Sequence, residues 1–259
     1  MKTNGNTILI TGGSSGIGFE FAKQFLALGN TVIVTGRDEK KLSAMKAALP
    51  AVHTIKSDVS APGEIEVLLK KVTAEFPKLN VLINNAGIMR TINFHDAADL
   101  DGLTQEIDIN LKGPIRLAMA FLPHLKKHGE AAIVNITSGL AFVPLPTSPI
   151  YCATKAGLHS FTLSLRVQLK NTRVKVFEVA PPATETELLS GMSAADRKGV
   201  QIMKVDDMVA ASIKGLETDR FEIRPGQANS LKFMSRVAPE FILKQLSGPM
   251  DRLLAETKN

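Results

Sequence analysis

Short apolar runs alternate with longer segments of helical periodicity over roughly the first 180 residues of the chain. The runs are rich in Val, Ile and Leu and show little alternation with polar residues, which is typical of strands that are buried on both faces. This pattern predicts six strands, near Thr7–Ile10, Thr31–Val34, Val52–Ile55, Val81–Ile83, Ala131–Val134 and Val174–Val179.

The intervening segments have the spacing of amphipathic helices. In the first of them, Ile17, Phe21 and Phe25 recur at i, i+4 and i+8, and Gly29 follows as a C-cap. Strands that alternate with helices predict βαβ units. The expected fold class is therefore α/β, a doubly wound, mostly parallel sheet flanked by helices. The other expected helices are a lysine-rich one ending near Leu49, Ile65–Phe76, Leu111–His128 and Ala153–Leu169.

We expect residues 1–259 to form a single domain, because 44% of the residues are hydrophobic and no linker interrupts the chain. The composition changes after about Pro181, where residues 183–204 are expected to form a substrate lid. Residues 228–259 are predicted to form a C-terminal helical tail, interrupted by Pro239 and by Gly248-Pro249.

The net charge of +6 does not indicate a nucleic-acid-binding protein, because the basic residues are dispersed and only 5% of the residues are aromatic. No apolar run reaches the roughly 18 residues of a membrane span. The N-terminus leads almost directly into a strand, which leaves no room for a signal peptide. Cys152 is the only cysteine, so no intramolecular disulfide is possible. Together these features predict a cytoplasmic protein.

A glycine-rich turn, Thr11–Gly18, follows the first strand and opens the first helix. Glycine at positions 12, 16 and 18 permits a tight turn, close approach of a pyrophosphate, and close packing of the helix on the strand. The helix N-terminus offers free N–H groups to phosphate. A glycine-rich turn alone is also compatible with a structural loop, but the strand–turn–helix context favours dinucleotide binding.

Tyr151, the only tyrosine, is followed four residues later by Lys155, so the two side chains share one helical face. A free phenol has a pKa near ~10, and a fixed cation beside it lowers that value. Ser138 is in a position to hold a substrate oxygen while Tyr151 gives or takes a proton. A Tyr-x-x-x-Lys pair is by itself common on solvated helix faces, so its meaning depends on the surrounding motifs.

Two further features have ordinary explanations. His124 and His128 have the i, i+4 spacing of metal ligands, but no acidic third ligand accompanies them, and a solvated helix face is the favoured interpretation. Cys152 lacks an identifiable histidine base, so it is interpreted as a small buried hydrophobic residue. No metal site is predicted.

Taken together, these motifs closely resemble the classical short-chain dehydrogenase/reductase family, and within it the DltE-like group of bacterial oxidoreductases. The resemblance covers about residues 6–190 in the family's order and spacing. It rests on TGGSSGIG at Thr11–Gly18, Asp58-Val59, NNAG at Asn84–Gly87, Asn110, Ser138, TSGLAF at Thr137–Phe142, YCATKAGLHSF at Tyr151–Phe161 and APP at Ala180–Pro182.

The resemblance implies a Rossmann-type fold and a catalytic tetrad. Tyr151 is then the acid–base, and Ser138 orients the substrate oxygen. Lys155 lowers the pKa of Tyr151 and binds the nicotinamide ribose. Asn110 kinks its helix and holds a water of a proton relay; taken alone, it could equally be a capping or turn residue.

The resemblance also implies a set of cofactor-binding positions. Asn85, Ala86 and Gly87 are expected near the adenine ribose, and Asp58 near the adenine amino group, although an exposed loop Asp is the ordinary alternative. The full set is Gly12, Ser14, Ser15, Gly16, Ile17, Gly18, Arg37, Asp58, Val59, Asn85, Ala86, Gly87, Tyr151, Lys155, Pro181, Thr184 and Thr186.

The cofactor is expected to be NADP, with NAD as the alternative. Relatives that prefer NAD carry an acid at the end of the second strand, whereas this chain has Gly36-Arg37, and a guanidinium matches a 2′-phosphate. Ser14 or Ser15 could add a hydroxyl, while Asp38 would repel the phosphate. Arg37 could also be a solvated charge at a helix start. Pro181-Pro182 replaces the family's Pro-Gly, so the backbone beside the nicotinamide is expected to differ there.

The sequence thus predicts an NADP-dependent oxidoreductase that acts on a small carbonyl or alcohol. The alternatives are an NAD-dependent secondary-alcohol dehydrogenase and a non-catalytic dinucleotide-binding redox sensor. A homodimer or homotetramer is expected, with dimer contacts through the helices Leu111–His128 and Ala153–Leu169. The final strand that supports tetramers in many relatives is expected to be replaced by Phe221–Arg224 and the proline-broken tail, which packs either over its own cleft or on a partner subunit.

Overall fold

The computed structural model of the chain describes residues 1–95, 100–189 and 201–256. Its centre is a seven-stranded sheet in the order β3-β2-β1-β4-β5-β6-β7, and every pairing is parallel. The strands are β1 (Thr7–Thr11), β2 (Thr31–Gly36), β3 (His53–Lys56), β4 (Leu79–Asn84), β5 (Ala131–Ile136), β6 (Val174–Val179) and β7 (Glu222–Ile223).

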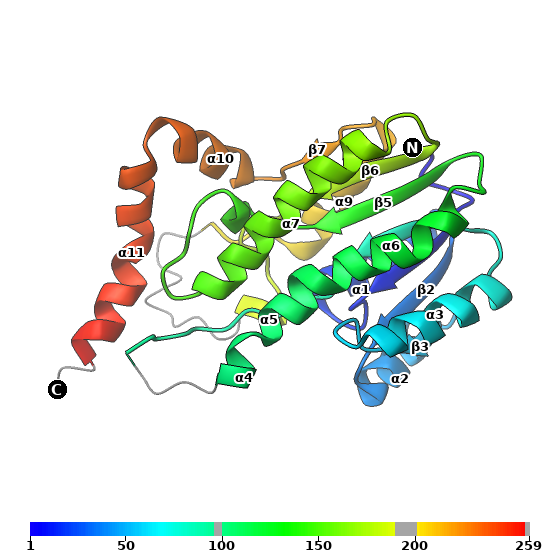
Figure 1. Cartoon of the computed structure of the whole chain (residues 1–259), viewed down its shortest axis with the longest axis horizontal. Coiled ribbons are helices and arrows are strands. Elements are labelled where there is room, and N and C mark those ends of the chain that lie inside the picture. Colours follow the sequence, from blue (N-terminus) through cyan, green and yellow to red (C-terminus); the bar gives the residue numbers. More distant parts are fainter. Residues whose placement is uncertain (96–99, 190–200, 257–259) are drawn as a thin grey trace.

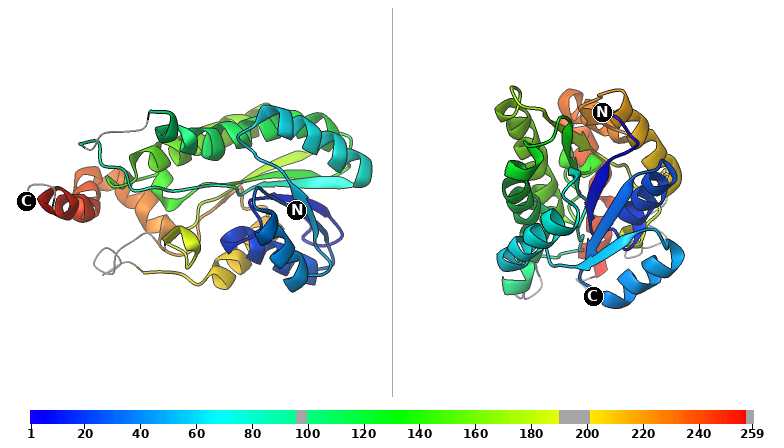
Figure 2. Two further views of the ribbon diagram at one scale, coloured as in Figure 1. Left: turned by 90° about the horizontal axis from the view of Figure 1, so that it is seen from below. Right: turned by 90° about the vertical axis from the view of Figure 1, so that its right-hand side faces the viewer.

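Helices cover both faces of this sheet, as Figure 2 shows. The main helices are α1 (Gly16–Ala27), α2 (Glu39–Ala48), α3 (Pro62–Glu75), α6 (Gly113–Leu125), α7 (Pro149–Gln168) and α9 (Val205–Glu217). Two short helices, α4 (Leu100–Leu103) and α5 (Gln105–Ile107), lead into α6. The doubly wound α/β fold predicted from the sequence is confirmed.

Two apolar clusters fill the spaces between the sheet and its two helical layers. In β1, Ile8 and Ile10 belong to the cluster under α1, α2 and α9, whereas Leu9 belongs to the cluster under α3, α6 and α7. Successive side chains of a strand point to opposite faces, so a continuous apolar run serves both clusters. The crossover helices thereby hold the carboxyl ends of the strands in place, and loops that carry chemistry follow those ends.

The end of α1 illustrates how the sequence sets a boundary. Gly29 has a φ of +79°, and the Asn30 backbone N–H donates to the Phe25 carbonyl. Such a left-handed residue closes a helix without steric cost only when it is glycine. The predicted C-cap at Gly29 is confirmed.

Three expectations about the elements need correction. The third strand is His53–Lys56, one residue later than predicted. The segment Phe221–Arg224 contains a seventh strand, β7, which pairs with β6 and was not predicted as a strand of the sheet. Pro249 does not break the tail: it lies inside α11, while the interruption occurs at Ala238, between α10 and α11.

The tail consists of α10 (Ala228–Val237) and α11 (Pro239–Glu256). Figure 1 shows these two helices at the end of the molecule toward which β5 points, with α11 standing clear of the two helical layers. Within the part of the chain that the structure describes, no helix has the length and apolar content needed to cross a membrane. The predicted lid, residues 183–204, includes residues 190–200, which lie outside the described residues.

Candidate active site

A cavity of about 1300 Å³ is lined by residues from the loops at the carboxyl ends of the strands and by residues of the tail. In open α/β sheets this edge is where ligands bind. Seventeen residues predicted from the sequence line it, and only Gly18 and Asn110 do not. The lining members are Gly12, Ser14, Ser15, Gly16, Ile17, Arg37, Asp58, Val59, Asn85, Ala86, Gly87, Ser138, Tyr151, Lys155, Pro181, Thr184 and Thr186.

The glycine turn is shaped by positions that leave no space for a side chain. Gly12 has a φ of +62°, and a Cβ added to it would lie 2.6 Å from the Ala86 Cα. A Cβ on Gly18 would lie 2.5 Å from Asn85 Nδ2. Gly12 therefore brings the first loop against the loop after β4, whereas Gly18 packs the helix on its neighbours rather than lining the cavity.

The N-terminus of α1 presents unpaired backbone donors to this cavity. Ser15 is its N-cap residue but makes no side-chain hydrogen bond to the helix, and the first turn contains no acidic residue. The first N–H groups of a helix lack intrahelical acceptors, and the helix dipole places positive charge there. The turn therefore fits the pyrophosphate of a dinucleotide.

Asn85 and Thr11 tie the loop after β4 to the glycine turn. The Asn85 side-chain amide donates to the Thr11 and Gly12 carbonyls at 3.0 and 2.9 Å. The Thr11 hydroxyl accepts from the Asn85 and Ala86 backbone N–H groups at 3.1 and 3.2 Å. These bonds join the two loops, so Asn85 shapes the wall of the cavity.

Arg37 directly follows β2 and lines the cavity. Its side chain is 51% exposed, and its Nη1 lies 3.6 Å from a carboxylate oxygen of Asp58. Asp38 is the N-cap of α2, and its carboxylate accepts from the Lys40 and Lys41 N–H groups. A cation is therefore available at this edge, while the neighbouring Asp38 carboxylate is held by the start of a helix.

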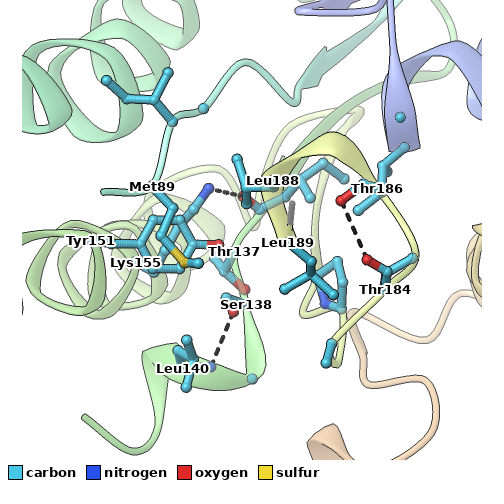
Figure 3. Close-up of a pocket in the computed structure, with 18 of the residues that line it drawn as sticks. Met89, Thr137, Ser138, Leu140, Tyr151, Lys155, Thr184, Thr186, Leu188 and Leu189 are labelled. Carbon is cyan, nitrogen blue, oxygen red and sulfur yellow. Dashed lines mark hydrogen bonds between the residues drawn. The ribbon is translucent and has the colours of Figure 1, made fainter. Parts of the chain in front are cut away.

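Ser138, Tyr151 and Lys155 meet where β5 ends and α7 passes over it, and Figure 3 shows them gathered with Thr137. All three side chains are buried. The Lys155 ammonium donates to the Ile136 carbonyl at 2.9 Å and lies 5.6 Å from the centroid of the Tyr151 ring. The Ser138 hydroxyl oxygen accepts from the Leu140 backbone N–H at 3.1 Å. The i, i+4 spacing thus places a phenol and an ammonium together in a low-dielectric site.

Burial governs the pKa values of this pair. It raises the pKa of Tyr151 to about 12, although a hydrogen bond with the Ser138 side chain acts in the opposite direction. Burial also lowers the pKa of Lys155 to about 8. The pKa of Tyr151 is therefore raised overall and not lowered as expected, because loss of water disfavours the charged form of both groups.

Asn110 lies behind this cluster, in a π-helical segment, Asp108–Lys112, between α5 and α6. Its side-chain amide donates to the Ile88 carbonyl at 2.8 Å and to the Thr154 hydroxyl at 3.2 Å, and its oxygen accepts from the Ile88 N–H at 2.9 Å. A π-helical turn widens the helix and often occurs at functional sites. The π-helical turn thus lies where the resemblance implies a kink, and Asn110 joins α7 to the loop after β4.

A buried acid that sequence reasoning missed lies next to Thr137. Glu178, in β6, accepts from the Thr137 hydroxyl at 2.7 Å and lies 2.8 Å from His159 Nδ1. Its side chain has no solvent exposure, so the His159 and Thr137 contacts compensate for its desolvation. No motif marked it, because in the strand VKVFEV it is one of two charged residues among apolar ones, and nothing in the sequence shows that Glu178 is buried.

The double proline is part of the cavity wall. The Pro181 carbonyl accepts from the Gly139 N–H at 2.8 Å, which ties this loop to the one that carries Ser138. The Thr184 hydroxyl donates to the Pro182 carbonyl at 2.9 Å, and the Thr186 hydroxyl donates to the Thr184 carbonyl at 3.3 Å. Figure 3 shows Leu188 and Leu189 between these threonines and the Tyr151 cluster.

The tail supplies a wall that the sequence left open. Residues of α10 and α11 line the same cavity as the catalytic candidates, so the tail covers its own cleft. Phe241, also in the tail, does not line the cavity and is 62% exposed. Further lining residues are not among the predicted site positions: Met89, Leu140, Leu145, Leu188, Leu189, Gln227, Leu231, Met234, Ile242, Gln245, Leu246, Pro249 and Arg252. For those in the tail, the apolar spacing of the helices was the only sequence signal.

The remaining candidates carry no chemistry in this arrangement. His124 and His128 are half-buried rather than solvated, with their Nε2 atoms 3.2 Å apart. Among the described residues, no group of three or more His, Cys, Asp or Glu side chains could hold a metal ion. Cys152 is buried, its sulfur accepts from the Leu145 N–H, and burial raises the pKa of its thiol.

The fold and the cleft agree with known proteins. A sequence model of the short chain dehydrogenase family matches residues 6–197. The chain belongs to the short-chain dehydrogenase family. It is 43% identical over 252 residues to the uncharacterized oxidoreductase DltE of Bacillus subtilis, covering 95% of this chain and 98% of that protein. As a member of this family, the protein is an oxidoreductase that depends on a nicotinamide dinucleotide.

Solved short-chain dehydrogenases have the same architecture. One from Burkholderia cenocepacia, in complex with NADP, has a TM-score of 0.82 and 25% identity and covers 95% of this chain and 99% of its own. A 3-ketoacyl-(acyl-carrier-protein) reductase from Brucella melitensis, in complex with NADH, has a TM-score of 0.78 and 25% identity, with 86% and 98% coverage. Both forms of the nicotinamide cofactor therefore occur among the structural relatives.

Proposed function

We propose that the protein is an NADP-dependent oxidoreductase that interconverts a carbonyl compound and an alcohol, with Tyr151 as the acid–base. The observation that carries this proposal is the meeting of Ser138, Tyr151 and a buried Lys155 in the cavity onto which the glycine turn opens. A redox sensor would have no need of a phenol and a hydroxyl directed at one point of that cavity.

The cofactor, when bound, would supply or accept the hydride, and the protein's residues position the substrate and transfer the proton. Ser138 donates a hydrogen bond to the substrate oxygen and fixes its position. Tyr151 transfers the proton to or from that oxygen. A phenol with a pKa of about 12 is neutral at physiological pH, so Tyr151 is prepared to donate a proton in the reduction direction.

Lys155 and Asn110 act around that proton transfer. Lys155 is the only ammonium among the lining residues near Tyr151 in the described part of the chain, and its charge stabilises phenolate as the proton leaves. Asn110 holds Ile88 and Thr154, and through them it fixes the wall beside Gly87, where an added Cβ would lie 3.6 Å from Lys155 Nζ.

Three observations support NADP over NAD. The residue at the end of β2 is Gly36 and not an acid. Arg37 lines the cavity. The Ser14 hydroxyl lies 3.3 Å from the position that a Cβ on Gly36 would take. A guanidinium and a hydroxyl at this edge suit a 2′-phosphate. The capping role of Asp38 lessens the repulsion that a free carboxylate would cause. A relative solved with NADP and another, from Sphingobium yanoikuyae, solved with NADPH are consistent with this choice.

A homodimer is part of the proposal. The outer faces of α6 and α7 expose Met119 and Val167, and small residues such as Ala156 and Ser160 permit close approach of a second copy. The tail is occupied with its own cleft and is not required for this contact. Light scattering should give the mass of a dimer, and a monomeric full-length protein would remove this part of the proposal.

The catalytic proposal is tested by a turnover screen of aldehydes, ketones and alcohols with NADPH and NADH, followed by Tyr151→Phe. Loss of the proton donor should lower turnover by ~10²–10⁴-fold, while NADPH binding, measured by fluorescence titration, stays nearly intact. Unchanged turnover in Tyr151→Phe would reject the role of Tyr151. Binding of NADPH by the wild type with no turnover of any substrate would favour the sensor.

A further inference from the structure

The cavity is divided into two chemically different halves. Near the glycine turn its lining includes the charged residues Arg37, Asp38, Lys41, Asp58 and Glu187. On the tail side the lining is apolar apart from a few polar groups, and Arg252 is the single charged residue among the described lining residues of the tail. A dinucleotide accounts for the charged half, so the apolar half is left for the substrate.

The apolar wall begins directly beside the proposed catalytic serine. A Cβ added to Gly139, the residue after Ser138, would lie only 2.9 Å from the Leu231 Cδ1 of α10. The absence of a side chain at Gly139 is therefore what allows Leu231 to lie against the Ser138 loop. A substrate whose oxygen is held by Ser138 has the first turn of α10 as its immediate neighbour.

From there the wall continues along α11. Ile242, Leu246 and Pro249 recur every three or four residues, with Gln245 among them, and the same helical face ends at Arg252. Ten residues of helix separate Ile242 from Arg252, which corresponds to about 15 Å. This length exceeds what a small ketone or aldehyde can cover.

The facing wall is also apolar. Met89 lies in the segment after β4, Leu140 and Leu145 in the segment after β5, and Leu188 and Leu189 in the segment after β6. Figure 3 shows Met89, Leu140, Leu188 and Leu189 around Tyr151 and Ser138. An apolar chain placed between these walls would lose its contact with water, whereas a polar or charged substrate would find few partners there.

We propose that the natural substrate is a carbonyl compound, or the corresponding alcohol, carried on an apolar chain that extends from Ser138 along the inner face of the tail. This inference rests on the proposed function. In the reduction direction the hydride of NADPH goes to the carbonyl carbon and the Tyr151 proton to its oxygen, so that C=O becomes CH–OH while NADPH becomes NADP⁺.

Chain length provides the first test. For the series 2-butanone to 2-undecanone with NADPH, kcat/KM of the wild type should rise by up to about fourfold per methylene, as expected for burial of each CH₂, and then level off. A flat profile, or a decline beyond the shortest ketones, would overturn the inference while leaving the proposed function standing.

A matched pair of tryptophan variants locates the chain. Leu246 lines the cavity, whereas Leu243, on the same helix, does not line it and is 40% exposed. Leu246→Trp should lower kcat/KM for 2-undecanone at least tenfold and change it less than twofold for 2-butanone; Leu243→Trp should change neither. If Leu246→Trp does not fold, Met234→Trp on α10 serves the same purpose, because Met234 also lines the cavity. Equal losses for both ketones in the folded variant would contradict the chain path.

Binding without turnover separates this inference from the catalytic one. Calorimetric titration of the NADP⁺-saturated protein with 1-butanol, 1-hexanol, 1-octanol and 1-decanol should give a Kd that tightens with each added pair of methylenes in the wild type. In Leu246→Trp that gain should disappear. Tightening in the wild type together with no ketone turnover would retain the apolar chain site and reject the proposed reaction; no tightening would reject the chain site.

Discussion

The two ends of the cavity differ in how their walls are formed. One is the cofactor end, at the glycine turn, where we propose that the dinucleotide binds; the other is the tail end, at α10 and α11. At the cofactor end, backbone approaches backbone: Gly12 lies against Ala86, Gly18 against Asn85, and hydrogen bonds from Asn85 join the loops. At the tail end, two amphipathic helices turn one face inward while residues such as Phe241 remain exposed on the other. The first arrangement permits few substitutions, whereas the second requires only apolar residues at the right spacing. This difference suits an enzyme family whose members share a cofactor but act on different substrates.

A glycine substitution at the cofactor end should have the largest effect on stability. In Gly12→Ala the new Cβ meets the Ala86 backbone at 2.6 Å with a positive φ, so the free energy of unfolding should fall by about 2–4 kcal/mol. At the tail end, Met234→Leu should cost less than about 1.5 kcal/mol, because it conserves volume in an apolar wall. Urea unfolding followed by circular dichroism measures both.

Gly63→Ala is the control for glycine replacement itself. Gly63 lies in α3, and a Cβ there has no neighbour within 4 Å, so alanine should leave stability unchanged or raise it by about 0.5–1 kcal/mol. If Gly12→Ala were as well tolerated as Gly63→Ala, the difference between the two ends of the cleft would not hold.

The two arginines of the cavity should differ in what they recognise. Arg37→Ala removes charge-assisted hydrogen bonds worth ~1.5–3 kcal/mol, so the Kd for NADPH should rise about tenfold, or up to a hundredfold if solvent screens little of the interaction. The Kd for NADH should hardly change, because it lacks the 2′-phosphate. Arg252→Ala, at the tail end, should alter neither. Fluorescence titration gives all four values, and an equal loss of both cofactors in Arg37→Ala would contradict the assignment of NADP.

At the junction of the two ends, the buried Lys155 should make stability depend on pH. Its pKa in the folded protein is about 8, below the 10.5 of an exposed lysine, so the unfolded chain binds more protons between these values. Stability should therefore rise with pH in this window, by about 2 kcal/mol between pH 7.5 and pH 9.5. Lys155→Met should lack this rise in the same denaturant titrations. A parallel pH dependence in both proteins would show that Lys155 is not desolvated as described.

Much of the cofactor end could be predicted from the sequence, because close backbone packing there admits only particular residue types at particular positions. Only glycine fits at Gly12, and the strand–turn–helix context of Gly16 is visible in the order of the residues. The alternation of short apolar runs with helical segments predicted the parallel sheet, because crossover helices bury both faces of each strand. Catalytic roles at Ser138 and Tyr151 stay predictions until turnover is measured.

The features that the sequence did not disclose depend on tertiary context. β7 has only two residues, too few for a periodic signal. Pro249 stays within α11 although prolines usually end helices, so local preference alone misplaced the break. The spacing of apolar residues in the tail does not show which of them face the cavity: Leu231 and Leu246 line it, whereas Phe241 is 62% exposed. The direction of the Tyr151 pKa depends on burial, which sequence spacing does not report.

The π-helical segment at Asn110 constrains the number of residues between α5 and α6. Each residue of a helix turns the next side chain by about 100°. Loss of one residue between Gln105 and Gly113 would regularise the helix and turn Asn110 away from Ile88 and Thr154, or else rotate the buried Leu117 and Phe121 of α6 out of the core. Insertions and deletions should consequently be rarer here than in the surface loops around it, and homologues that lack the residue should have lost the bond between α7 and the loop after β4.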